Sequence, residues 1–315
     1  MSSLKKAAQV AIEKCISLKP HEKILIVYDN PQKEIALSLL NHSKKISSQS
    51  MLLKINSPKL NGEEPEESVA NSLLNQDVIM LVTSKSLSHT KARRRATEQG
   101  CRIASMPGIT KDTFIRTMDA DYGVIQNLTN KLAEILTNGK IAKITTQLGT
   151  NIIMNIEGRI SNKGALIREK KDFNNLPSGE ACLGPIEGTT NGVLIVDASF
   201  LEKVDQPITL KIENGFVIDI KGGLIAKKVK KVLDSVNSKN AYAIAELGIG
   251  THHKAKITGN ILEDEKVLGT AHIALGNNLS YGGHIDVPIH LDGVFLNPTI
   301  HIDDKKIIEN GKLLI

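Results

Sequence analysis

Short apolar runs recur along the N-terminal part of the chain, and a stretch with helical spacing follows each of them. We predict strands at Lys23–Asp29, Ser50–Asn56, Asp77–Thr83 and Cys101–Met106. The intervening helices are predicted at Lys33 to about Lys45, Glu66–Asn75 and Thr90–Gln99. Near-continuous apolar strands that alternate with helices are typical of a parallel sheet covered on both faces. The pattern therefore predicts an α/β domain over residues 1–138, with a further helix at Tyr122–Thr137 near its end.

The pattern changes after Asn138, where apolar and polar residues alternate between turn glycines and asparagines. Lys143–Arg159 is predicted to form two strands around Gly149, and the β-rich pattern continues beyond it. One clear amphipathic helix is predicted at Leu224–Val236. Residues 139–315 are therefore predicted to form a mixed α+β domain that is rich in antiparallel strands.

Composition excludes several functional classes. The net charge of +6 is compatible with nucleic-acid binding. However, the densest lysine cluster forms one face of the helix predicted at Leu224–Val236, and no aromatic residues interleave with it. The apolar runs are too short to span a bilayer, and the N-terminus lacks the apolar core of a signal peptide. Three widely spaced cysteines, Cys15, Cys101 and Cys182, indicate reduced thiols. We therefore expect a cytoplasmic protein without a nucleic-acid or membrane partner. No glycine fingerprint for a dinucleotide or a P-loop is present.

Metal-capable side chains stand in apolar surroundings in the second half of the chain. His290 and Asp292 are two residues apart in an apolar segment, so on a strand they would project from one face. His272 lies among small apolar residues, and alone it would be interpreted as a core histidine. Glu246 interrupts an apolar strand-like run, where an unpaired charge is costly. Glu180 is framed by glycines and prolines, which predicts a rigid loop.

Together with Glu265, which lies seven residues before His272, these residues form a set of four carboxylates and two imidazoles. The set consists of Glu180, Glu246, Glu265, His272, His290 and Asp292. Such a mixture suits a pair of divalent first-row ions, with zinc, cobalt and manganese all compatible. Two ions that share bridging carboxylates activate a water molecule for hydrolysis.

At these residues the chain resembles the aminopeptidase T family of dinuclear metallo-aminopeptidases. The segments that carry the resemblance are NLPSGE with Glu180, AELGIG with Glu246, EDEKVLGTAHIALG with Glu265 and His272, and HLD with His290 and Asp292. The resemblance implies that Glu246 and Asp292 lie between two ions, while the other four ligands cap the outer sides. It also implies a homodimer and a metal-dependent aminopeptidase that acts on small peptides, with Glu265 and Glu246 as candidate catalytic residues.

A second chemistry within the same superfamily stays open. Enzymes similar to 2,5-dihydroxypyridine dioxygenase hold one Fe(II) ion with two histidines and one carboxylate, and His272, His290 and Asp292 would satisfy that pattern. The peptidases also carry a tyrosine where this chain has NNL, with Tyr281 slightly further on. Retention of Glu180, Glu246 and Glu265 favours the two-metal peptidase, because one iron would leave those carboxylates without a cation. A metal-binding protein without catalysis is disfavoured, since structural zinc sites are usually rich in cysteine.

Overall fold

The computed structural model describes residues 3–162 and 164–315, and the chain divides into two compact units. Unit 1 comprises Met1–Gly123 and Ala165–Ser178, and unit 2 comprises Val124–Gly164 and Gly179–Ile315. These units are groups of residues in mutual contact. The sequence predicted two independently folding domains, 1–138 and 139–315, and this division stays a prediction.

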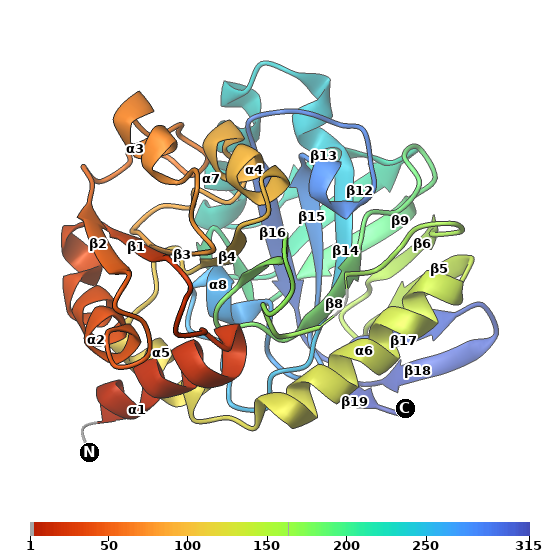
Figure 1. Ribbon diagram of the computed structural model, residues 1–315. Coiled ribbons are helices and arrows are strands. Elements are labelled where there is room, and N and C mark those ends of the chain that lie inside the picture. The colour runs from red at the N-terminus through yellow and green to blue at the C-terminus, as the bar shows by residue number, and fades with distance from the viewer. Residues whose placement is uncertain (1–2, 163) are drawn as a thin grey trace. The chain divides into compact units, whose positions relative to one another are not determined.

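Unit 1 is built on a five-stranded parallel sheet with the strand order β2-β1-β3-β4-β7 (Figure 1). Its strands are β1 (Ile24–Tyr28), β2 (Ser50–Lys54), β3 (Val78–Val82), β4 (Arg102–Ser105) and β7 (Phe173–Asn175). Every residue of β1, β3 and β4 is buried, as expected for inner strands covered on both faces. The predicted parallel α/β sheet is therefore confirmed.

Helices cover both faces of this sheet. They are α1 (Ser3–Gln9) with a π-helical continuation (Val10–Ile16), α2 (Lys33–Ser43), α3 (Glu67–Ser72), α4 (Lys91–Glu98) and α5 (Lys111–Met118). Helices α3 and α4 pack on the face that carries Leu25 and Val27, whereas α1, α2 and α5 contact one another on the other side (Figure 1). The side chain of Thr90 caps α4 and that of Thr110 caps α5, each accepting a backbone N–H bond.

Unit 2 contains two antiparallel sheets, which confirms the predicted richness in antiparallel strands. The six-stranded sheet has the order β11-β10-β16-β15-β14-β8. Its strands are β8 (Glu180–Leu183), β10 (Ser199–Phe200), β11 (Glu202–Lys203), β14 (Ile244–Gly250), β15 (Ala271–Gly276) and β16 (His290–Phe295).

The eight-stranded sheet has the order β13-β12-β9-β6-β5-β17-β18-β19. Its strands are β5 (Ile141–Thr145), β6 (Asn151–Asn155), β9 (Asn191–Val196), β12 (Ile208–Glu213), β13 (Phe216–Lys221), β17 (Thr299–Ile302), β18 (Lys305–Glu309) and β19 (Lys312–Leu313). The helices of this unit are α6 (Tyr122–Asn138), whose first two residues are counted with unit 1, α7 (Leu224–Ser235) and the short α8 (Ile261–Asp264). In the part of the chain that the structure describes, no helix combines the length and apolar character needed to cross a membrane.

One hydrophobic core joins the two sheets of unit 2 with α6 and α7. Strand β14 contributes Leu247 and Ile249 to this core. Because side chains alternate along a strand, the side chain of Glu246 projects from the opposite face of the six-stranded sheet, where Gly248 leaves space. That face carries the candidate ligands.

Candidate metal centre

The structure brings all six predicted ligands together in unit 2. Glu180 begins β8, Glu246 lies on β14, His272 lies on β15, and His290 and Asp292 lie on β16. These four strands are neighbours in one sheet. Glu265 follows α8 directly and supplies the remaining carboxylate. The loop predicted for Glu180 is wrong, because this residue is the first of a paired strand, opposite Gly250.

Small residues make room for the larger side chains on this face. Ala274 pairs with Glu246 on one side and with Asp292 on the other, so it separates the two carboxylates. Gly248 pairs with His272, and a Cβ atom at position 248 would lie 2.1 Å from Cε1 and Nε2 of the imidazole. The ring of His272 therefore occupies space that only a glycine leaves open.

Four side chains converge at the centre of the site. Nε2 of His290 lies 2.9 Å from Oε2 of Glu246 and 3.3 Å from Oδ1 of Asp292. Nε2 of His272 lies 3.4 Å from Oε1 of Glu246. Ligand atoms of Glu246, His272 and Asp292 all lie within 4.8 Å of one another. We call His272, His290, Asp292 and Glu246 the central cluster.

Contacts of His290 orient its ring toward the two carboxylates. Nδ1 lies 2.7 Å from the backbone carbonyl oxygen of Asn277, which can only accept, so Nδ1 carries the proton and donates. The ring of Tyr281 stacks on that of His290, with centroids 5.1 Å apart. In the neutral imidazole, Nε2 then presents a lone pair to two carboxylates, an arrangement that needs a proton or a metal ion between them.

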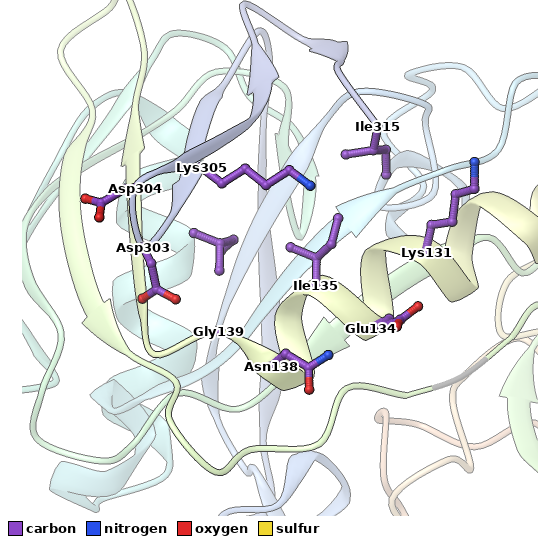
Figure 2. Close-up of a pocket in the computed structure, with 10 residues that line it drawn as sticks. Lys131, Glu134, Ile135, Asn138, Gly139, Asp303, Asp304, Lys305 and Ile315 are labelled. Carbon is purple, nitrogen blue, oxygen red and sulfur yellow. The ribbon is translucent and has the colours of Figure 1, made fainter.

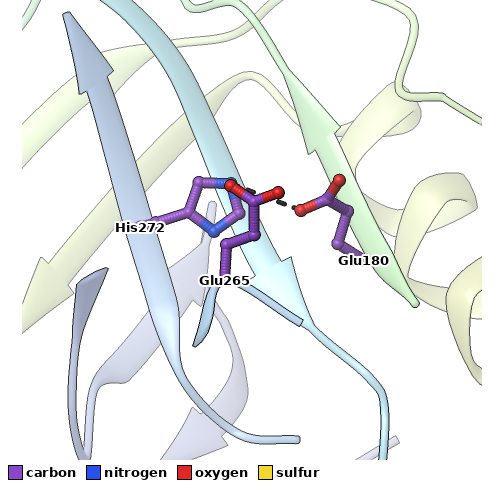
Figure 3. Close-up of side chains that lie close together, drawn as sticks. All are labelled: Glu180, Glu265 and His272. Atoms are coloured by element: carbon purple, nitrogen blue, oxygen red, sulfur yellow. Dashed lines mark ion pairs between the residues drawn. The ribbon is translucent and has the colours of Figure 1, made fainter. Parts of the chain in front are cut away.

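Glu180 and Glu265 contact a lysine side chain that the sequence analysis did not identify. Nζ of Lys266 lies 2.6 Å from Oε1 of Glu180 and also contacts Oε1 of Glu265. The Lys266 side chain is fully buried. Figure 3 shows the carboxyl groups of Glu180 and Glu265 converging with the imidazole of His272, whose Nε2 lies 3.5 Å from Oε2 of Glu180. We call Glu180, Glu265 and Lys266 the lysine cluster.

The backbone around Lys266 is held by the end of β14. The backbone N–H of His252 donates to the carbonyl oxygen of Lys266 at 2.8 Å, and the N–H of Lys266 donates to Glu263 at 2.9 Å. A Cβ atom at Gly250 would lie 2.1 Å from the carbonyl oxygen of Val267, so the turn packs closely on the strand. His252 is buried and supports the turn through its backbone.

Protonation equilibria in the site are shifted by burial and by neighbouring charges. Burial raises the pKa of Glu265 to about 8, with Glu180 and Asp292 adding to the effect against Lys266. Burial would lower the pKa of His272, but the carboxylates of Glu246 and Glu180 raise it to about 9. Glu265 and His272 thus retain protons more strongly than in water, and neighbouring carboxylates contribute to both shifts.

The donor atoms fit a divalent metal ion. Nδ1 of His272 is buried and has no hydrogen-bond partner among the residues that the structure describes. Burial favours the neutral form of Glu246, yet its contacts with His272 and His290 hold its pKa well below the usual range. Imidazole nitrogens and carboxylate oxygens together suit first-row transition metals.

Other features of unit 2 lie outside this site. A surface cavity of about 690 Å³ is lined by the C-terminal part of α6, the turn at Asp303 and Asp304, and Ile315 (Figure 2). None of its lining residues belongs to the central cluster or the lysine cluster. His284 is exposed. Cys182 is buried beside the site, and burial and the charges of Glu246 and Glu180 raise its pKa.

The chain shares its fold with two solved structures. It superposes on 2,5-dihydroxypyridine dioxygenase from Pseudomonas putida KT2440 with a TM-score of 0.85 and 17% sequence identity, over 100% of this chain and 98% of the other. It superposes on wild-type AmpT from Thermus thermophilus with a TM-score of 0.75 and 14% identity, over 99% of each chain. At such identities both likenesses concern the fold.

Sequence comparison matches the chain to the dioxygenase. The family model of 2,5-dihydroxypyridine 5,6-dioxygenase (NicX) matches residues 14–315. The 2,5-dihydroxypyridine 5,6-dioxygenase of Pseudomonas putida is 28% identical over 156 residues, an alignment that spans 45% of this chain and 45% of that protein. The chain therefore aligns with less than half the length of this curated relative.

These matches overturn the predicted aminopeptidase function, together with its assignment as a hydrolase and a metallopeptidase. The physical reason lies in Lys266. The prediction assumed that Glu180 and Glu265 need a second metal ion, but the Lys266 ammonium group already supplies a positive charge to both. The match over residues 14–315 is decisive: the chain belongs to the 2,5-dihydroxypyridine 5,6-dioxygenase family.

Proposed function

We propose that this chain is a ring-cleaving dioxygenase that uses one Fe(II) ion and acts on a dihydroxylated pyridine. The observation that carries the proposal is the convergence of His272, His290 and Asp292 on one face of a sheet, in a chain of this family. Two histidines and one carboxylate form the facial triad of many non-haem iron oxygenases. The metal-dependent character of the site is supported by the grouping of Glu246, His272 and Asp292.

Each residue of the central cluster has a role in this proposal. Fe(II), when bound, supplies the one-electron chemistry with oxygen that amino-acid side chains lack. His272, His290 and Asp292 would hold it. The Asn277 carbonyl and the Tyr281 ring keep Nε2 of His290 directed at the site. Glu246, whose low pKa keeps it ionised, accepts a hydrogen bond from a ring hydroxyl of the substrate.

The substrate and the assembly state belong to the same proposal. The curated relative acts, by its name, on 2,5-dihydroxypyridine, and we extend to this chain only the class of dihydroxylated pyridines. A small-molecule substrate agrees with the buried position of the ligands, because a buried site favours a compact aromatic ring. The homodimer implied by the sequence resemblance stays a prediction.

The decisive experiment is oxygen uptake by protein loaded with Fe(II) under anaerobic conditions. On addition of 2,5-dihydroxypyridine and oxygen, we expect oxygen consumption in step with loss of the aromatic absorbance. His290→Ala should abolish both signals, since it removes a proposed iron ligand. His301→Ala, on β17 of the other sheet, is the matched control and should retain activity. Iron-loaded protein that consumes no oxygen with any dihydroxypyridine isomer would refute the proposal.

A further inference from the structure

Lys266 lies among the second group of side chains that could hold a metal ion, which consists of Glu180, Glu265 and His272. Its Nζ is 2.6 Å from Oε1 of Glu180 and contacts Oε1 of Glu265, so it sits between the two carboxylates. Metal–carboxylate bonds are about 2.0–2.2 Å long for ions such as zinc. An ion coordinated by these same two oxygen atoms would overlap the ammonium group. One position therefore cannot hold both cations.

Burial and backbone hydrogen bonds hold the Lys266 side chain in this position. It is fully buried, and its backbone is tied on both sides, to His252 through the carbonyl oxygen and to Glu263 through the N–H. Withdrawing Nζ would leave two carboxylates close together in a buried setting without a cation. Such an arrangement is strongly unfavourable.

The charge balance of the two clusters points the same way. Four carboxylates, those of Glu180, Glu246, Glu265 and Asp292, contribute four negative charges at most. Two dications would balance them in a chain without a lysine here. With Lys266 present, one dication leaves an excess of one negative charge and two would leave an excess of one positive charge, so a single ion already brings the buried site close to neutrality.

We propose that Lys266 serves as a built-in replacement for the second metal ion and limits the site to one ion. The inference rests on the proposed single-iron function and adds the residue that sets the metal count. Glu180 and Glu265 then act as partners of Lys266 and not as metal ligands. The metal ion is held by His272, His290 and Asp292.

Counting bound ions tests this proposal without any activity measurement. Metal-free protein is saturated with Mn(II), desalted, and analysed for manganese per chain by mass spectrometry. Wild type should bind one ion. Lys266→Ala should bind two, because the space and both carboxylates become available to a metal. Lys231→Ala, on the exposed face of α7, is the matched control and should still bind one.

Glu265→Gln provides a second measurement that leaves the lysine in place. Its manganese count should stay at one, whereas Asp292→Asn should lower it toward zero. If Lys266→Ala can be recovered only from medium containing Mn(II), the ion count of that material decides between the same two results.

Two ions in wild type, one ion in Lys266→Ala, or loss of the ion in Glu265→Gln would each overturn the role of Lys266. A different result would refute the proposed function. Wild type with one iron but without oxygen uptake would refute the dioxygenase and leave the metal count intact.

Discussion

Gly248 shows how a single missing side chain shapes the site. A Cβ atom there would lie 2.1 Å from the His272 imidazole, and the backbone of Gly248 is outside the left-handed region that favours glycine. Gly248→Ala should therefore act through steric overlap alone. We expect a loss of about 1–3 kcal/mol in the free energy of unfolding, together with weaker metal binding, measured by denaturation and metal titration.

Gly123→Ala is the control for this substitution. A Cβ atom at Gly123 would meet only Oδ1 of Asp121, at 3.1 Å, and alanine has the higher helix propensity near the start of α6. Its stability should be unchanged or slightly raised. If Gly248→Ala bound metal as tightly as wild type, the His272 ring would not need its present position.

Substitution of Glu246 tests which residues hold the metal ion. In a one-ion site held by His272, His290 and Asp292, Glu246→Gln keeps all three of these ligands. We expect a metal affinity about 10–100-fold weaker, because the carboxylate that contacts both imidazoles loses its charge, while the count stays at one ion per chain. Isothermal titration with Mn(II) measures both quantities. A complete loss of binding would show that Glu246 is itself an indispensable ligand.

Sequence reasoning found five of the candidate ligands because each one interrupts an apolar or glycine-rich segment, whereas Glu265 came from the family resemblance, and the structure brings all six together. It missed Lys266, although this residue directly follows Glu265. Lysines are mostly solvated, so a lysine in a charged segment gives no local signal of burial. Its partner Glu180 is 86 residues away, and only the pairing of distant strands creates that contact.

At the scale of elements, the apolar periodicity predicted β1 to β4 and the helices α2, α3, α4, α6 and α7 to within a few residues. Strand β7 was missed because Phe173–Asn175 is polar and short, and its pairing with β4 comes from outside the local pattern. Helix α5 was also missed. Local patterns predict elements that bury a regular apolar face, whereas β7 depends on a partner distant in sequence.

A buried ion pair ties the segment before β1 to β4 in unit 1. Arg102 donates two hydrogen bonds to Glu22, at 2.6 and 2.9 Å, and Lys19 donates its backbone N–H to the same carboxylate. Burial raises the pKa of Glu22, but these bonds outweigh it and hold the pKa below the usual value. The pair therefore stabilises the fold fully above the unfolded-state pKa of about 4.3, and this contribution is lost as the pH falls through the lower folded value.

Glu22→Gln should cost roughly 3 kcal/mol near neutral pH, because it leaves the Arg102 guanidinium buried without its counter-charge. The difference from wild type should shrink as the solution becomes acidic. Urea unfolding from about pH 7 to about pH 3 measures it. Asp119→Asn, which removes an exposed partner of Lys6, should cost less than about 1 kcal/mol. An equal and pH-independent loss in both variants would contradict this assignment.

At the scale of the whole molecule, all the proposed metal ligands belong to unit 2. A ligand that binds only the folded state stabilises it by about 2.7 kcal/mol at 100 times its dissociation constant. We expect Mn(II) to slow amide exchange most strongly in β14, β15 and β16, measured by hydrogen–deuterium exchange. Amides of β1 and β3 in unit 1 serve as the internal reference. Equal protection in both units would show that the metal acts through more than its local contacts.

A lysine and a metal ion differ in how the cell provides them. The ammonium group of Lys266 is made with the polypeptide, in fixed proportion, and neither chelation nor competition among metals can remove it. Shortage of iron would then empty one position of the site while the neighbouring carboxylates remain neutralised. The apo-protein would keep the shape of that half of the site and be ready to take up a single ion. Incorporation of the wrong metal, a hazard at any site of imidazoles and carboxylates, would likewise be confined to one position.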